Sequence, residues 1–198
     1  MIWVVVIVVA IVVLLLLVLV GMFNKLVRLR NRAQNAWAQV DVQLRKRYDL
    51  IPNLVESVKG YAAHESQTFE AVTQARTAAQ QAQGVAQQAQ AENALTAAIG
   101  RLFAVAEAYP QLRATENFQQ LQAQLTEVEQ QIAVSRQVYN DTVLTYANAL
   151  QTVPTNVVAG LFHFQQREYF QTEDATRDAP RVQFTEPQVT PPPPVQST

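Results

Sequence analysis

Cysteine is absent from this chain, and glycine is scarce, with five residues among 198. Without cysteine the chain has no disulfide bridges, no thiolate metal site and no cysteine nucleophile. Five glycines are too few for a glycine-rich phosphate loop or for a β fold with many tight turns. Alanine and glutamine are abundant instead, and helices tolerate both residue types well. The composition therefore favours an all-α fold.

Charge is absent altogether from Ile2 to Phe23, a run of 22 residues. As a helix this run would span about 33 Å, enough to cross a hydrocarbon core of about 30 Å. A cleaved signal peptide is the alternative, but it would need a basic start, a shorter apolar stretch and a small-residue cleavage site. The sequence shows none of these, so we expect a transmembrane anchor at residues 1–23, with the lipid bilayer as a partner.

Basic residues gather directly after the apolar run. Seven of the fifteen lie between Lys25 and Arg47. By the positive-inside rule this predicts a single-pass protein with its N-terminus outside and the following domain in the cytoplasm. The same residues could attract anionic lipid headgroups, at about 1 kcal/mol for each charge. They could equally serve only to set the orientation. The net charge of −1 predicts no nucleic-acid partner.

Apolar residues recur at steps of three and four over most of residues 24–170, which predicts a helical bundle domain. Pro52 interrupts the first stripe. We expect a turn there, with Asp49 capping a second helix, because proline lacks an amide donor and disfavours a helical conformation at Ile51. A kinked single helix is the alternative. The second helix would carry apolar residues from Leu54 through Tyr61 to Ala75.

Two further helices follow in the pattern. Residues 80–91 are low in complexity and predict a connection hinged at Gly84. A third helix should end before Pro110, and a fourth should run from a cap at Thr115 to Pro154. The fourth carries a five-heptad apolar pattern typical of a coiled coil.

The third helix, at about eighteen residues and 27 Å, is too short to cover the fourth along its whole length. Residues Tyr146, Leu150 and Val153 would then lack a partner within the bundle, which predicts a homo-oligomer. The alternative is that the first or second helix covers them, or that residues 157–170 fold back onto them. Residues 171–198 are rich in proline and predict an extended to disordered tail, which either binds an aromatic-lined groove or stays solvated without a partner.

No set of residues forms a recognisable catalytic, cofactor-binding or metal-binding site. His64 and Glu65 begin like a zinc-protease motif, but Thr68 stands where the second histidine is required. The other histidine, His163, is distant in sequence, and the acidic residues are scattered along the helices. We therefore assign no catalytic, cofactor or metal residue and expect no enzyme.

The stretch from Lys25 to Glu65 resembles the signature of the LemA family of bacterial membrane proteins. The matching elements are Leu29-Arg30-Asn31, Asn35-Ala36-Trp37, Asp41-Val42-Gln43-Leu44, the basic triplet before Tyr48, Asp49-Leu50-Ile51-Pro52-Asn53-Leu54 and Val58-Lys59-Gly60-Tyr61. Later matches include Tyr109-Pro110, Asn117-Phe118, Tyr139-Asn140, Pro154-x-Asn156 and Phe162-x-Phe164. The resemblance covers about residues 1 to 185 and leaves the last prolines outside it.

The resemblance implies a single-pass protein of the bacterial inner membrane with a cytoplasmic antiparallel helical bundle and no known enzymatic activity. Relatives include a protein of magnetosome formation, which suggests a role in membrane organisation. We therefore expect a membrane-anchored helical scaffold or assembly protein that acts through helix–helix contacts, with other membrane proteins as further partners. The alternative is a signalling or protease-accessory adaptor that docks one partner through the bundle or the tail. A membrane-bound hydrolase, the third option, lacks a recognisable site.

Overall fold

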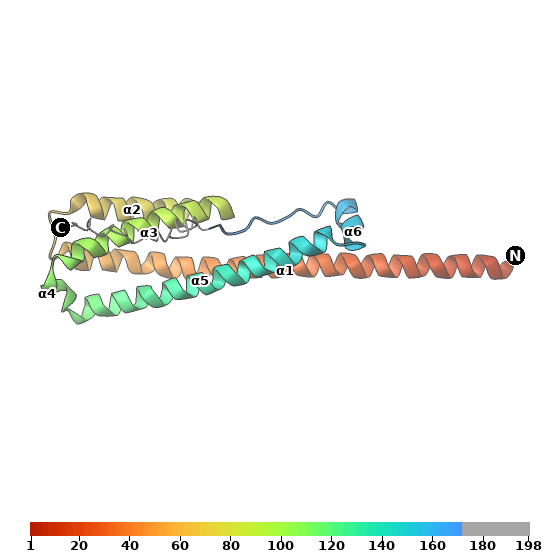
Figure 1. The fold of residues 1–198 in the computed structure, drawn as a ribbon, viewed down its shortest axis with the longest axis horizontal. Helices are drawn as coiled ribbons and strands as arrows, with labels where there is room; N and C mark the ends of the chain where they lie inside the picture. The colour runs from red at the N-terminus through yellow and green to blue at the C-terminus, as the bar shows by residue number, and fades with distance from the viewer. Residues whose placement is uncertain (172–198) are drawn as a thin grey trace, which may run out of the picture.

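The computed structural model describes residues 1–171, and within this range every regular element is a helix (Figure 1). The predicted all-α bundle is confirmed. The helices are α1 Ile2–Lys59, α2 Ser66–Gln81, α3 Val85–Glu107, α4 Pro110–Arg113, α5 Glu116–Gln151 and α6 Thr155–Leu161. The predicted Pro-rich tail, apart from Gln171, lies outside the described residues.

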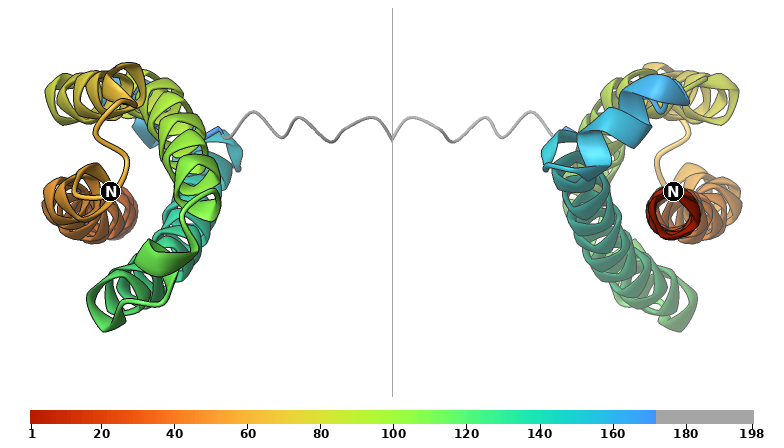
Figure 2. Two further views of the ribbon diagram at one scale, coloured as in Figure 1. Left: turned by 90° about the vertical axis from the view of Figure 1, so that its left-hand side faces the viewer. Right: turned by 90° about the vertical axis from the view of Figure 1, so that its right-hand side faces the viewer.

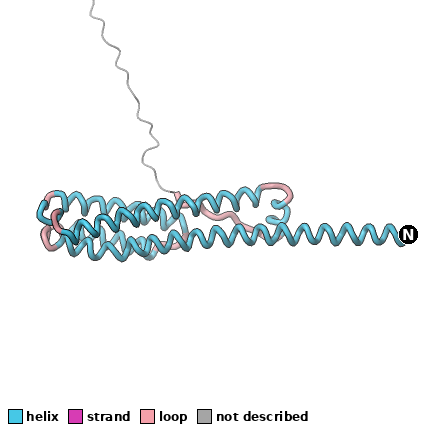
Figure 3. Tube along the Cα trace, turned by 90° about the horizontal axis from the view of Figure 1, so that it is seen from below, coloured by secondary structure: helices cyan, strands magenta, loops and turns pink. Residues whose placement is uncertain are grey.

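Helix α1 contains both the apolar N-terminal run and the first helix of the bundle. Its N-terminal part is exposed on all sides and projects beyond the other helices (Figure 3). Among the described helices, α1 alone is long and apolar enough to cross a bilayer. From Leu26 onward the same helix carries core residues of the bundle. The candidate anchor and the bundle are therefore connected by continuous helix rather than by a linker.

The expected turn at Pro52 is wrong, and so is the second helix beginning at Asp49. Helix α1 continues through Pro52 to Lys59. Proline cannot donate to the carbonyl four residues earlier, which is that of Tyr48. In this fold Nε of Arg76, on α2, donates to that carbonyl at 2.8 Å. A side chain from another helix thus replaces the missing amide, while Ile51 is buried in the core beside the proline.

The first real break comes after Gly60, so Tyr61 lies in a connection and not on the second helix. Gly84 separates α2 from α3 with a φ of 81°, and the predicted hinge there is confirmed. The connection is shorter than residues 80–91, because α3 already begins at Val85. Its first turns hold Gln88 and Glu92, polar residues that are buried.

The fourth predicted helix corresponds to α5, preceded by Thr115 as expected. The central positions of its heptad face are buried. Val153, predicted to belong to this face, lies after the end of α5 and is exposed, whereas Val143, which the heptad pattern leaves out, is buried. The expectation that this face lacks a partner near its end is wrong. Tyr146 and Leu150 pack against residues of α1 and of α6, so the alternative is correct: the first helix and a folded-back segment together cover them.

Viewed along the long axis, α2, α3 and α5 curve around one side of α1 (Figure 2). The α2–α3 hairpin packs against only the half of the α1–α5 pair that is remote from the N-terminus, which we call the distal half (Figure 1). Beyond the hairpin, the chain after α6 returns in extended form along the pair. We call residues 164–171 the strap. Hairpin and strap thus complete different halves of one helix pair.

Candidate functional site

The distal half has a polar centre inside its apolar core. Arg47 of α1 and Glu92 of α3 are both fully buried. Nη1 of Arg47 donates to Oε2 of Glu92 at 3.0 Å, and Nη2 donates to the hydroxyl of Thr96 at 2.8 Å. A buried ion pair of this kind is stable only when the remaining donors and acceptors are also satisfied.

The second carboxylate oxygen of Glu92 is satisfied by two further side chains. The hydroxyl of Tyr48 donates to it, and Nε2 of Gln88 lies 2.9 Å away. Gln88 also donates to the carbonyl of Ala79 at 3.1 Å, which ties in the end of α2. Burial, and then the hydrogen bond to Glu92, hold the pKa of Tyr48 far above its usual value, so the phenol remains a neutral donor.

Helix α5 also contacts this centre, through Glu129. Its Oε1 lies 2.9 Å from Nε of Arg47, so the two groups form an ion pair. The geometry at Nε does not meet the criteria of a hydrogen bond. The centre therefore contacts α1, α2, α3 and α5 together. Both carboxylate oxygens of Glu92 and the hydroxyl of Tyr48 take part in these hydrogen bonds. The buried polar contacts of this centre link four helices to one another.

The strap is held by side chains of α5. Oδ1 of Asn140 accepts from the Phe170 amide at 2.9 Å, and its Nδ2 donates to the Phe170 carbonyl at 3.1 Å. The Phe170 ring is buried, with the guanidinium of Arg136 4.4 Å from its centre and Trp37 beside it. Burial lowers the pKa of Arg136 from its ordinary value. The hydroxyl of Tyr139 donates to the carbonyl of Glu168 at 2.8 Å.

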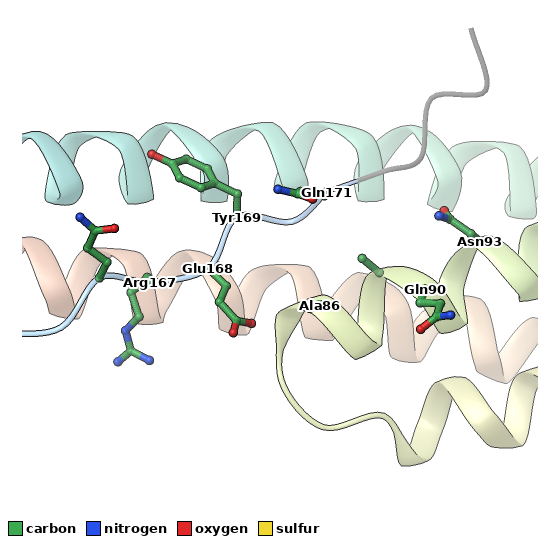
Figure 4. Close-up of a pocket in the computed structure, with 9 residues that line it drawn as sticks. Ala86, Gln90, Asn93, Arg167, Glu168, Tyr169 and Gln171 are labelled. Atoms are coloured by element: carbon green, nitrogen blue, oxygen red, sulfur yellow. The ribbon is translucent and has the colours of Figure 1, made fainter. Parts of the chain in front are cut away.

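Two surface features adjoin this framework. An open pocket of about 660 Å³ lies between the start of α3 and the strap, with Asn93 and Glu168 among its polar lining (Figure 4). A shallow groove of about 390 Å³ lies between α1 and α5 alone. We call it the valine groove, and it is lined by Ala38, Gln39, Val42, Gln43, Gln131, Val134, Ser135 and Val138.

Comparison with known proteins places most of this chain in one family. The sequence model of the LemA family matches residues 36–184, three quarters of the chain. The chain belongs to the LemA family. The magnetosome protein MamQ 2 of Paramagnetospirillum magneticum is 26% identical over 183 residues, covering 79% of this chain and 67% of that protein. Protein LemA of Metamycoplasma hominis is 24% identical over 161 residues, covering 81% and 74%.

The LemA-family match includes Arg47, Glu92 and the strap, so the polar centre and the strap belong to the family domain. With its apolar α1 segment and these relatives, the chain is a membrane-associated helical protein. From the sequence alone, Arg47 is grouped only with the basic residues that follow the apolar run. The overlooked signal is its position, because Arg47 continues the buried series Val40, Leu44 and Ile51 at steps of three and four.

The residues considered for metal chemistry are not brought together. His64 and His163 are both exposed, and His64 lies in the connection between α1 and α2. Across residues 1–171, no three histidine, aspartate or glutamate side chains are grouped as a metal ion would require. The assignment of no catalytic, cofactor or metal residue stays a prediction, to be tested by assay.

Proposed function

We propose that this LemA-family protein is a membrane-tethered scaffold that assembles with copies of itself through the valine groove. The observation that carries the proposal is the exposure of this groove. Val42, Val134 and Val138 are 51%, 59% and 42% exposed. No lining residue comes from α2, α3 or the strap, so the other residues of the described range 1–171 leave the groove uncovered.

The chemistry of the groove suits a second copy. All of its lining residues are uncharged, so two grooves can approach without like-charge repulsion. Val134 and Val138 are four residues apart on α5 and form the kind of ridge that packs into a facing helical groove. Oε1 of Gln43 is buried there and has no hydrogen-bond partner among the described residues. Rotation of this side chain toward the groove would let a donor from a neighbouring copy satisfy it.

The tether makes a modest interface sufficient. Eight residues line the groove, fewer than the roughly 20–30 residues that each partner of a stable soluble complex contributes. Two copies anchored in one membrane share an orientation and a high effective concentration, which reduces the cost of association. Met22 and Phe23, at the end of the apolar run, pack with the bundle and so support an anchor that is kept in the mature protein.

Cysteine crosslinking tests the assembly, since the chain has no native cysteine. Gln39→Cys places a thiol at the groove, and Gln67→Cys places one on α2 as the matched control; both positions are exposed. In native membranes Gln39→Cys should give a disulfide-linked dimer and Gln67→Cys should not. Equal crosslinking at both sites, or none at Gln39 where a known membrane dimer crosslinks, would contradict the proposal.

The proposed compartment is the bacterial cytoplasm beside the inner membrane, with the N-terminus outside. The support is the basic cluster from Lys25 onward, on the side that the positive-inside rule assigns to the cytoplasm. A fluorescent protein that matures only in the cytoplasm, fused after Thr198, should be bright. An active exported phosphatase at the same position would mean that the bundle lies outside.

The adaptor function is the second candidate, and the pocket beside the strap favours it. Charged and amide side chains of α3 and the strap line that pocket, as docking of a polar segment would require (Figure 4). An adaptor would stay monomeric in membranes until its partner is added. Monomers at Gln39 together with partner-dependent crosslinking at Gln90→Cys would select this function.

A further inference from the structure

Helix α6 and its flanking turns form a distinct surface at the end of the bundle nearest the apolar run. We call residues 152–163 the α6 tip. In the end view from the N-terminal side, α6 lies crosswise to α1 at this end of the bundle (Figure 2). Helix α6 therefore does not run alongside the helix that would cross the membrane.

Aromatic contacts fix the tip at the level where the apolar run of α1 ends. The ring of Phe23 lies 4.8 Å from the ring of Phe162 and 5.5 Å from that of Phe164. Val158 and Ala159 are buried with Leu26 on the other side of α6. The tip is thus packed against α1 at the boundary between its apolar residues and the basic residues that follow.

The outward face of the tip is strongly apolar. Val153, Val157, Leu161 and Phe162 are 74%, 65%, 65% and 52% exposed. No charged residue occurs between Gln151 and Gln166, whereas Lys25 and Arg28 follow closely after Phe23 on α1. Adjacent large apolar side chains of this kind, exposed on a folded domain, mark an interaction site.

We propose that the α6 tip is a second membrane-contact element, which inserts its apolar face into the boundary between lipid headgroups and acyl chains. A helix in that position lies in the membrane plane with its apolar face buried about 5–10 Å. The occupant is the bilayer because the tip is continuous with the end of the apolar run, at the depth where a spanning α1 leaves the hydrocarbon. The neighbouring lysine and arginines match anionic headgroups. This contact does not depend on self-association.

Depth-resolved fluorescence quenching tests the tip in the full chain. The probe is an environment-sensitive fluorophore on Leu161→Cys, in vesicles of phosphatidylcholine and phosphatidylglycerol that carry nitroxide lipids. The matched controls are Tyr61→Cys, exposed at the opposite end of the bundle, and Val12→Cys, inside the apolar run. Val157→Cys repeats the measurement one turn away on the same face of α6.

We expect a blue-shifted emission at positions 161 and 157, with most of it lost to nitroxides placed near the headgroups. Position 12 should respond most to nitroxides deep in the bilayer, and position 61 should respond to neither. Emission at 161 and 157 equal to that at 61 would overturn the proposal. Blue-shifted emission that lipid nitroxides do not quench would also overturn it, by showing that protein covers the tip. An unquenched position 12 would overturn the proposal by showing that α1 does not span the bilayer. The Val134→Arg variant, which targets self-association, should leave all these readings unchanged.

Discussion

The distal and membrane-side halves of the bundle complete the same α1–α5 pair in different ways. The distal half adds the α2–α3 hairpin and aligns four helices around the buried Arg47–Glu92 ion pair. The membrane-side half adds the short α6 and the extended strap, which supplies one buried aromatic ring. An extended segment has no helical hydrogen bonds of its own, so Asn140 and Tyr139 must satisfy its backbone.

This difference predicts unequal stability along the molecule. The distal half is secured by contacts among four helices, and its loss requires the buried charges to separate. The strap depends on a few side chains near the end of the described chain, so it should open locally at lower cost. The valine groove is lined by α1 and α5 only. We therefore expect it to remain available for self-association when the strap opens locally.

Glu92→Ala should produce the largest effect, because it leaves the guanidinium of Arg47 buried without its partner. Breaking such a pair typically costs about 3–5 kcal/mol. The measurement is the urea midpoint of the full chain in mild detergent, with Glu107→Ala, exposed on the same helix, as the control. Arg47→Met combined with Glu92→Leu should recover most of the loss. A midpoint unchanged by Glu92→Ala would mean that the centre does not align the helices.

Phe170→Ala should release the strap without unfolding the distal half. Removing a buried phenylalanine ring typically costs about 3–5 kcal/mol, here limited to the free energy that holds the strap. Hydrogen exchange should lose protection at the Phe170 amide and keep it along α3. Tyr169→Ala, next in the chain and partly exposed, is the control. Loss of protection in α3 as well would show that the two halves unfold together.

Alkaline pH should weaken the distal half through Tyr48. Its pKa is raised on folding, so the stabilisation is fully present below the unfolded value of 10.0 and is lost as pH rises above it. The expected slope approaches about 1.4 kcal/mol per pH unit for this group. Tyr48→Phe should show a shallower decline in unfolding free energy between pH 10 and 11. Identical slopes would indicate that other groups account for the alkaline loss.

The smallest effect concerns Pro52 and Arg76. Arg76→Met should destabilise the wild-type chain by about 1–2 kcal/mol, because the carbonyl of Tyr48 loses its donor. In a Pro52→Ala background the amide of residue 52 can take over, so the same change should cost less. A double-mutant cycle measured by thermal unfolding should give a coupling of about 0.5–1.5 kcal/mol. Additive effects would refute the compensation.

Much of this architecture could be predicted from the sequence. Apolar periodicity located α5, Gly84 marked the hinge, and the uncharged run identified the candidate anchor. The failures share a physical cause, which is that a distant residue decided the local structure. Pro52 stays helical because Arg76 supplies a donor, and Arg47 is buried because Glu92 and Glu129 meet it. The sequence of the strap has no helical or strand periodicity. Its neighbours in sequence therefore gave no indication that Asn140 would bind its backbone.

Counting copies in the membrane tests the central claim most directly. A fluorophore attached after Thr198 allows the photobleaching steps of single complexes to be counted in native membranes. Wild-type protein should bleach in two or more steps, and Val134→Arg, which places a charge in the valine groove, should bleach in one. Leu144→Arg, an equally large change at an exposed apolar position of α5 outside the groove, should match wild type. Single steps for wild type, or multiple steps that survive Val134→Arg, would contradict assembly through the groove.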